Sequence, residues 1–354
     1  SFNDAKVTGY YLGDLPNADL KWESTAQFDA GFDIGLFDGR LTFTADYYEK
    51  NTSGLLLEVT LPVSSGYSSA LKNTGKVRNR GVELALGATV LKSPITWDTQ
   101  LNWSMNRNKI IDLGDSEPFF ETTAGVAYIE EGHSLGEFYG YKTEGIFKTQ
   151  AGADAYTAQP DAVAGDVKFV DVEPDGTIDA SDRTWIGNPY PDFIFGWNNT
   201  FRYKAFSLTT FIMGTVGNDV FNITDARRSV LSSSLALNHS YKRFKDRWSS
   251  ENPDGSQPRA GWTAGVWSID PYVEDASFIR LRTLQLGYDI PVKNVSLIRN
   301  AFIYISGQNL FTITNYNGYN PEVNSVSQNN LIQGVDMGAY PLARTYLLGI
   351  KVEF

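Results

Sequence analysis

The chain ends on the stretch ARTYLLGIKVEF, residues 343–354, in which apolar and polar side chains alternate from Arg344 onward. One face of such a strand would carry Tyr346, Leu348, Ile350, Val352 and Phe354. The other face would carry Thr345, Gly349, Lys351 and Glu353, with Leu347 as the one exception. A period of two is typical of a half-buried strand. A final strand that stops on an aromatic residue is typical of an outer-membrane barrel, because its outer face meets lipid.

The same alternation recurs along the chain. It is clearest at 25–36, 41–48, 82–90 and 97–106, and further strands are predicted at 192–203, 205–214, 277–290, 300–311 and 343–354. Asp38-Gly39, between the first two, is a strong tight-hairpin signal. Strands of about ten residues match the 9–11 residues that span a membrane. The sequence therefore predicts an all-β fold, an antiparallel transmembrane β-barrel to which this chain supplies about nine strands.

The predicted connections alternate between short and long. Those at 37–40, 91–95 and 203–206 are tight and 291–299 is modest, whereas the long ones span 51–78, 109–191, 215–276 and 312–342. Outer-membrane barrels have short periplasmic turns and longer extracellular loops. If Phe354 lies at the periplasmic edge, the tight turns are periplasmic, the long loops are extracellular, and the start of the chain lies outside the cell.

Composition narrows the class further. A formal net charge of -11 argues against nucleic acid as a partner. No apolar run approaches 18 residues, so no transmembrane helix is predicted. The absence of cysteine is weak evidence for an oxidising compartment. Bacterial single-chain barrels have an even strand number, so nine strands are expected to be part of a larger barrel, and the absence of a signal peptide agrees with a mature product or a fragment.

Several motifs carry a family resemblance in their order along the chain. They are Leu15–Glu23 (LPNADLKWE), Asn73–Glu83 (NTGKVRNRGVE), Ile186–Phe193 (IGNPYPDF), Arg247-Trp248 followed by Pro258–Ala260, Ala276–Arg282 (ASFIRLR), Gly307–Phe311 (GQNLF) and Gly318–Glu322 (GYNPE). Together they make the chain resemble the C-terminal part of the SusC/RagA-like TonB-dependent transporters of Bacteroidota outer membranes. The resemblance covers residues 1–354 as one barrel portion.

The resemblance implies a barrel of about 22 strands with an N-terminal plug. It also implies import of oligosaccharide or peptide, energised by TonB-ExbB-ExbD through the plug, with a SusD-like lipoprotein as a lid. The plug and the first strands would lie upstream of this chain. Outer-membrane lipid would surround the barrel.

An acidic stretch within the predicted 109–191 loop has the spacing of a twelve-residue calcium loop. Its candidate ligands are Asp171, Glu173, Asp175, Thr177 (through its carbonyl), Asp179 and Asp182. Gly176 stands at the sixth position, where the sharp turn requires glycine. Glu173 and Asp182 depart from the usual residues, and Asp182 makes the loop resemble the dockerin version. The alternative is an acidic surface turn.

Aromatic residues crowd the predicted long loops and provide tentative substrate contacts. These are Trp262, Trp267, Tyr316 and Tyr319. The alternative is that such rings pack the loops together or touch the lipoprotein. Catalysis is not expected, because the only histidines, His133 and His239, lie in predicted loops and no nucleophile elbow or zinc motif is present.

Two other functional classes remain open. One is an outer-membrane barrel that acts as an adhesin or as a scaffold for surface glycan-degrading enzymes. The weaker one is a soluble calcium-dependent carbohydrate-binding β protein. A plug and a TonB box upstream would distinguish the importer from the adhesin or scaffold. Recovery without detergent would favour the soluble protein, and heat-modifiable migration on a gel would exclude it.

Overall fold

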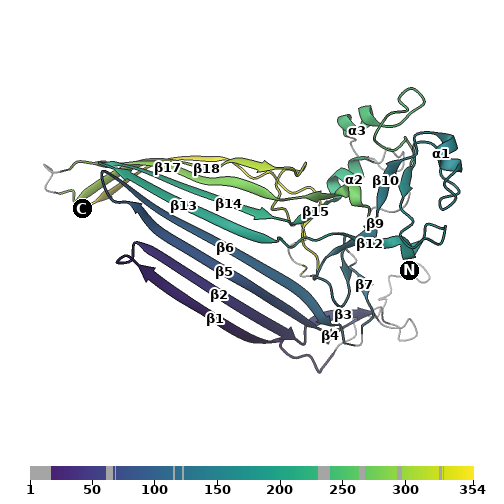
Figure 1. Cartoon of the computed structure of the whole chain (residues 1–354), viewed down its shortest axis with the longest axis horizontal. Helices are drawn as coiled ribbons and strands as arrows, with labels where there is room; N and C mark the ends of the chain where they lie inside the picture. Colours follow the sequence, from purple (N-terminus) through teal and green to yellow (C-terminus); the bar gives the residue numbers. More distant parts are fainter. Residues whose placement is uncertain are drawn as a thin grey trace, which may run out of the picture.

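A single nine-stranded antiparallel sheet dominates the computed structural model, which describes residues 17–60, 67, 69–114, 116–121, 123–229, 240–262, 268–292, 297–326, 329 and 331–354. The strand order is β1-β2-β5-β6-β13-β14-β17-β18-β20, so sequential strands are neighbours (Figure 1). The strands are β1 (Ser24–Leu36), β2 (Leu41–Ser53), β5 (Lys76–Leu91), β6 (Ile95–Asp112), β13 (Phe193–Tyr203), β14 (Phe206–Val216), β17 (Phe278–Ile290), β18 (Asn300–Thr314) and β20 (Thr345–Glu353). The nine predicted strands are confirmed.

The pairing register gives this sheet one apolar and one polar face. Leu84 of β5 lies opposite Ala45 on one side and Trp103 on the other. Its neighbour Glu83 lies opposite Asp46 and Ser104. Because successive side chains point to opposite faces, the predicted apolar and polar rows are each kept together across strands.

The tight turns lie at one end of the sheet. Between β1 and β2, Phe37, Asp38 and Gly39 all have positive φ angles, of 56°, 55° and 76°. Glycine adopts this region without steric cost, which is why the Asp-Gly pair marks the turn. Lys204, between Tyr203 and Phe206, also has a positive φ of 53°.

Several strands run further than the alternation predicts. β6 continues to Asp112, so the long loop predicted at 109–191 begins after that residue. β5 likewise begins at Lys76, inside the predicted loop 51–78. Residues Asn106 to Lys109 are all polar, so no alternation of apolar and polar side chains marks them as part of a strand. Their strand pairing is set by the ladder with β5 instead.

The long connections contain short elements, gathered at the opposite end of the sheet (Figure 1). Hairpin β3 (Leu56–Thr60) and β4 (Ser69–Asn73) belongs to the first connection. The rest are β7 (Phe119–Phe120), β8 (Tyr128–Ile129), β9 (Phe138–Tyr141), β10 (Thr143–Ile146), α1 (Gln150–Asp154), β11 (Val167–Phe169), η2 (Ala180–Asp182), β12 (Arg183–Gly187), β15 (Asp219–Asn222), α2 (Ile223–Ser229), α3 (Tyr241–Asp246), η3 (Asp270–Tyr272), β16 (Val273–Asp275) and β19 (Val335–Asp336). We call the described parts of 113–192, 217–277 and 315–344 the loop cap. Among the residues that the structure describes, no helix is long and apolar enough to cross a membrane.

Most of the buried core lies in the loop cap rather than along the sheet. Its largest cluster joins residues from all three cap segments, and Phe138, Phe221 and Ile332 in it are completely buried. β15 lies at the centre of a small sheet, antiparallel to β16 and parallel to β19. By contrast every residue of β1 is exposed.

The large sheet is open, with β1 and β20 as its two edges. β1 pairs with β2 and β20 with β18 in the described part of the chain. Each edge strand therefore presents a row of unpaired backbone groups, which can pair with a further strand.

Candidate functional site

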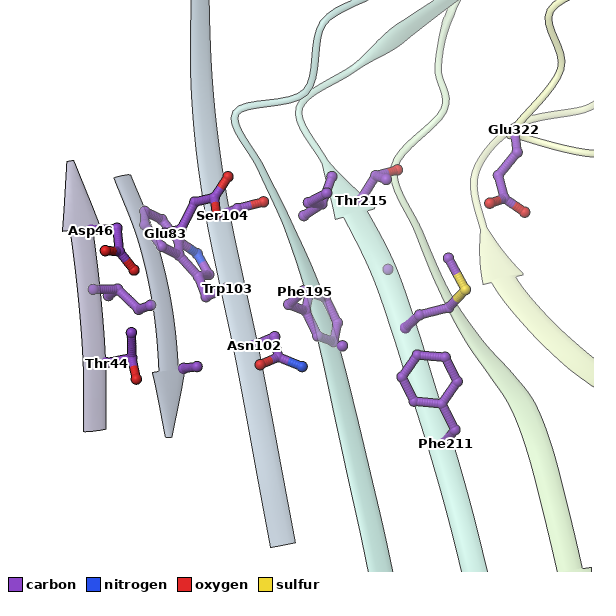
Figure 2. Close-up of a pocket in the computed structure, with 16 residues that line it drawn as sticks. Thr44, Asp46, Glu83, Asn102, Trp103, Ser104, Phe195, Phe211, Thr215 and Glu322 are labelled. Atoms are coloured by element: carbon purple, nitrogen blue, oxygen red, sulfur yellow. The ribbon is translucent and has the colours of Figure 1, made fainter. Parts of the chain in front are cut away.

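A cavity of about 580 Å³ lies along the sheet at β2, β5, β6, β13 and β14. The polar face supplies Asp46, Glu83 and Ser104 to it, and Glu322 joins them from the segment after β18 (Figure 2). Phe211 and Met213 of β14 add apolar surface. Clefts that combine apolar surface with a few convergent polar groups are typical ligand sites.

The register explains why the cavity wall is acidic. Asp46 and Glu83 are directly opposite each other on neighbouring strands. Like charges in this position destabilise the sheet, so a contribution to stability does not explain why both carboxylates are present. One row further, Thr44 donates its hydroxyl hydrogen to Asp33 Oδ1 at 2.5 Å. The wall offers carboxylates and hydroxyls to a polar solute.

A buried arginine attaches the last cap segment to the sheet. Arg280 is only 1% exposed and lies in β17. Its Nε donates to Thr312 Oγ1 and its Nη2 to Asn320 Oδ1, both at 2.8 Å. Its Nη1 pairs with the Glu322 carboxylate. Two of the motifs noted in the sequence, ASFIRLR and GYNPE, therefore meet at one ionic contact beside the cavity.

A bulge follows this arginine and interrupts the β17–β18 register between Leu281 and Thr283. Arg282 Nη1 donates to Asn309 Oδ1 at 3.0 Å, and Asn309 Nδ2 donates to the carbonyl of Ala343 at 3.0 Å. Asn309 has a positive φ of 53°, a conformation that asparagine tolerates. The bulge explains the irregular alternation of β17 and gives the GQNLF motif a structural role.

The tentative substrate residues have different surroundings. Trp262 and Tyr316 are buried in the loop cap, 6% and 5% exposed, whereas Tyr319 is 70% exposed. The Tyr316 hydroxyl donates to Asp336 Oδ2 at 2.6 Å, and burial together with that carboxylate raises the pKa of Tyr316. Trp267 lies outside the described residues. Of the three that are described, only Tyr319 presents its ring to solvent.

A second aromatic group, which the sequence did not single out as a unit, lies on β7, β8, β9, β12 and the turn between β8 and β9. It comprises Phe120, Tyr128, His133, Tyr139 and Trp185, all half-buried. We call these five residues the aromatic cluster. The rings of His133 and Trp185 stack at 3.8 Å, and those of Tyr128 and Tyr139 at 4.8 Å. The rings come from positions up to 65 residues apart, so no local spacing could have grouped them.

The acidic loop is only partly arranged as a cation site. Gly176 N–H donates to Asp171 Oδ2 at 3.1 Å, and Asp171 Oδ1 is buried without a hydrogen-bond partner. Asp182 is completely buried. Its Oδ1 accepts from the N–H groups of Val172 and Glu173, and its Oδ2 from that of Asp179. Asp171 thus has a free oxygen for a cation, whereas Asp182 is occupied by the backbone.

The other proposed ligands, Glu173, Asp175, Thr177 and Asp179, are exposed. Hydrogen bonds from Ser181 lower the pKa of Asp179. Within the described part of the chain, no three His, Asp or Glu side chains are gathered closely enough to hold a metal ion. Calcium binding therefore stays a prediction.

Comparison with known proteins gives the family. Residues 1–297 match the model of the TonB dependent receptor-like β-barrel. TonB-dependent receptor P3 of Formosa agariphila is 34% identical over 99% of this chain and 36% of its own length. SusC of Bacteroides thetaiotaomicron is 29% identical over 98% of this chain and 34% of its own length.

The fold agrees with a solved relative. A chain in the structure of the RagAB peptide transporter superposes with a TM-score of 0.80, 26% identity, and coverage of 96% of this chain and 36% of that one. These relatives are named as receptors or transporters and none is named as an enzyme. This chain spans about a third of the length of the curated relatives it matches. The chain belongs to the TonB-dependent receptor-like β-barrel family and is SusC/RagA-like.

Proposed function

We propose that this chain forms part of the wall and the loop cap of a TonB-dependent outer-membrane nutrient importer. The observation that carries the proposal is the two-faced sheet. Its apolar face suits lipid, and its polar face lines a cavity at the level of the long loops. The names of SusC and the RagAB peptide transporter support it.

The rest of the barrel is the first partner. The unpaired edges at β1 and β20 would each cost several kcal/mol per backbone group in lipid, so both edges pair with further strands of the same barrel. A plug fills the space beside the polar face and connects it to TonB-ExbB-ExbD. The length of the relatives supports this view.

The direction of the sheet follows from its loops. The tight turns face the periplasm with the C-terminus, and the loop cap faces the outside with the start of this chain. Epitopes placed in the turn at Asp38 and near the exposed Asp254 test this orientation. On intact cells the epitope at Asp254 should bind antibody and that at Asp38 should not.

A SusD-like lipoprotein covers the loop cap, and the cargo is an oligosaccharide or a peptide. The half-buried rings of the aromatic cluster supply stacking surface, and the acidic cavity wall supplies hydrogen-bond acceptors. Trp185→Ala should weaken cargo affinity about five-fold, because an aromatic contact contributes roughly 0.5–1.5 kcal/mol beyond its buried area. Calorimetry with an oligosaccharide series and a peptide series measures this. Tyr241→Ala, an exposed aromatic residue on α3, is the control.

Calcium in the acidic loop is a separate proposal, supported by the unpartnered Asp171 Oδ1. Its role is to stiffen the connection between β6 and β13. Calorimetry on chelator-treated protein should show calcium uptake that Asp171→Asn or Asp175→Asn abolishes. Asp254→Asn should leave uptake unchanged. No uptake by the unchanged protein would exclude the site.

The importer itself is tested by uptake. Cells that carry the full-length protein should lose cargo uptake when either that protein or TonB is deleted. Retention of surface binding without any TonB-dependent accumulation would contradict the importer and favour the adhesin or scaffold reading.

A further inference from the structure

Four cationic side chains gather on the apolar face of the sheet, at the end where the loop cap lies. Arg78 of β5 is opposite Lys109 of β6, and Arg80 is opposite Arg107. All four share the face of Leu84 and Trp103, because they lie an even number of residues away along each strand. Opposite side chains are about 5 Å apart and alternate ones about 7 Å apart, so one small anion can touch several. We call these residues the cationic quartet.

The acidic residues around the quartet neutralise only part of it. Arg107 pairs with Asp192 at 2.8 Å. Glu49 of β2 lies opposite Arg80 and accepts a hydrogen bond from Asn51 at 3.0 Å. Within the described part of the chain, Arg78, Arg80 and Lys109 form no ion pair within 4 Å. In a chain of net charge -11, this local excess of positive charge is unusual.

An apolar groove begins below the quartet on the same two strands, β5 and β6, and on the neighbouring β2. It has a volume of about 390 Å³ and is lined by Phe43, Leu84, Leu86, Leu101 and Trp103. Leu84 is four residues from Arg80, roughly 13 Å along the strand. Val82 and Met105, also on this face, connect the two. The quartet and the groove therefore lie in line along the strands, and together they suit a ligand that has an anionic head group and an apolar chain.

We infer that this face binds a phosphorylated lipid of the outer leaflet, with its phosphate on the cationic quartet and an acyl chain in the groove. Arginine suits this role because its planar fork donates two parallel hydrogen bonds to phosphate oxygens. Free phosphate would engage the quartet alone, so the groove selects the lipid. The inference rests on the proposed function in one respect, that this face meets the membrane with the loop cap outside.

Native mass spectrometry of the full-length protein in detergent tests the site. The probes are a phosphorylated lipid A, the same lipid without its phosphates, and inorganic phosphate. The unchanged protein should retain the phosphorylated lipid at least about ten-fold better than the dephosphorylated one. Arg80→Gln with Lys109→Gln should remove this preference. Lys50→Gln with Lys92→Gln removes the same charge elsewhere and should keep it.

The groove has its own test in Leu101→Trp, which fills it without changing charge. This variant should bind less of both lipids and keep the preference for phosphate. If the double variant of the quartet does not fold, as heat-modifiable migration would show, Arg78→Gln alone is measured and should reduce the preference.

Equal retention of both lipids by the unchanged protein would overturn the site. So would a double variant that binds like its control, or binding of inorganic phosphate that displaces no lipid. Outer-membrane fractionation is scored separately. Recovery in that membrane without lipid selectivity refutes the lipid site alone, whereas absence from it refutes the proposed function.

Discussion

The nine-stranded wall and the loop cap are held together by different means. In the wall, each strand is bonded to its neighbours in sequence, and many side chains, including all those of β1, are exposed. In the loop cap, contacts join distant parts of the chain. Thr143 Oγ1 donates to Asp270 Oδ1 at 2.8 Å across 127 positions, and Asn329 Nδ2 to Glu121 Oε1 at 2.8 Å across 208.

This contrast shows where specific side chains determine the structure. In the proposed importer the wall lies in lipid, where its backbone ladder stabilises it because unpaired backbone groups are so costly there. The cap is stabilised by its buried apolar core and by a small number of buried polar contacts that fix its segments relative to one another. Substitutions of equal size should therefore destabilise the cap far more than the wall.

The largest effect is expected at the junction of the two regions. Arg280→Ala removes three hydrogen bonds of a buried guanidinium, to Thr312, Asn320 and Glu322, which together should cost about 3 kcal/mol. The segment 315–344 should become sensitive to protease at concentrations that leave the unchanged protein intact. Arg282→Ala removes one contact, to Asn309, and should cost only about 1 kcal/mol. Equal sensitivity of both variants would contradict the anchoring role of Arg280.

A smaller effect is expected inside the cap. Tyr316→Phe removes the hydroxyl that donates to Asp336, whose Oδ1 still accepts from Gly338 N–H and Ala339 N–H. One buried charge-assisted hydrogen bond is lost, and the expected loss of unfolding free energy is about 1–3 kcal/mol. Denaturant titration monitored at the cap measures it. Tyr319→Phe, on an exposed ring, is the control and should have almost no effect.

The pH dependence of the cap gives a third comparison. Burial, and then the neighbouring Asp275, raise the pKa of Asp219, although Asn188 N–H donates to its Oδ2 at 2.9 Å. The folded state therefore disfavours the charged form. Its stability contribution is complete below the unfolded pKa, near 3.9, and is lost as the pH rises through the raised pKa.

Asp219→Asn is neutral at every pH and keeps an acceptor for Asn188. It should raise the melting temperature at pH 7, and the gain should shrink as the pH approaches 4. Melting curves at both pH values measure this. A gain of the same size at both would show that the charge of Asp219 is not the cause.

The smallest effect is expected in the wall. Arg202 and Asp98 form an ion pair at 2.9 Å, with 58% and 40% of their side chains exposed. Arg202→Gln should change the unfolding free energy by less than about 1 kcal/mol, because exposed pairs contribute little. Denaturant unfolding of the variant and the unchanged protein measures this difference. A loss as large as that of Arg280→Ala would remove the distinction between wall and cap.

The same distinction explains what could be read from the sequence. Alternation and the Asp-Gly turn are local, so the nine strands and their order were predictable. The end of β6 was not, because residues 106–109 are polar on both faces and the ladder alone keeps them in the strand. The bulge at Leu281 likewise depends on Arg282 and on Asn309, 27 positions away.

The candidate site was predictable only in part. The polar row that lines the cavity follows from alternation, including Glu83 and Ser104. The pairing of Arg280 with Glu322 spans 42 positions, and neither the ASFIRLR motif nor the GYNPE motif indicates that it contacts the other. Trp262 and Tyr316 showed their aromatic character in the sequence but not their burial, since burial is decided by segments far away in the chain.

The position of β15 has a mechanical consequence. It hydrogen-bonds to β16 from its own cap segment and, through Phe221 and Val335, to β19 from the segment after β18. Two loops that are far apart in the sequence therefore share one small sheet. A displacement of either loop is therefore expected to move the other, and Arg280 is one of the contacts that tie the later loop to the sheet.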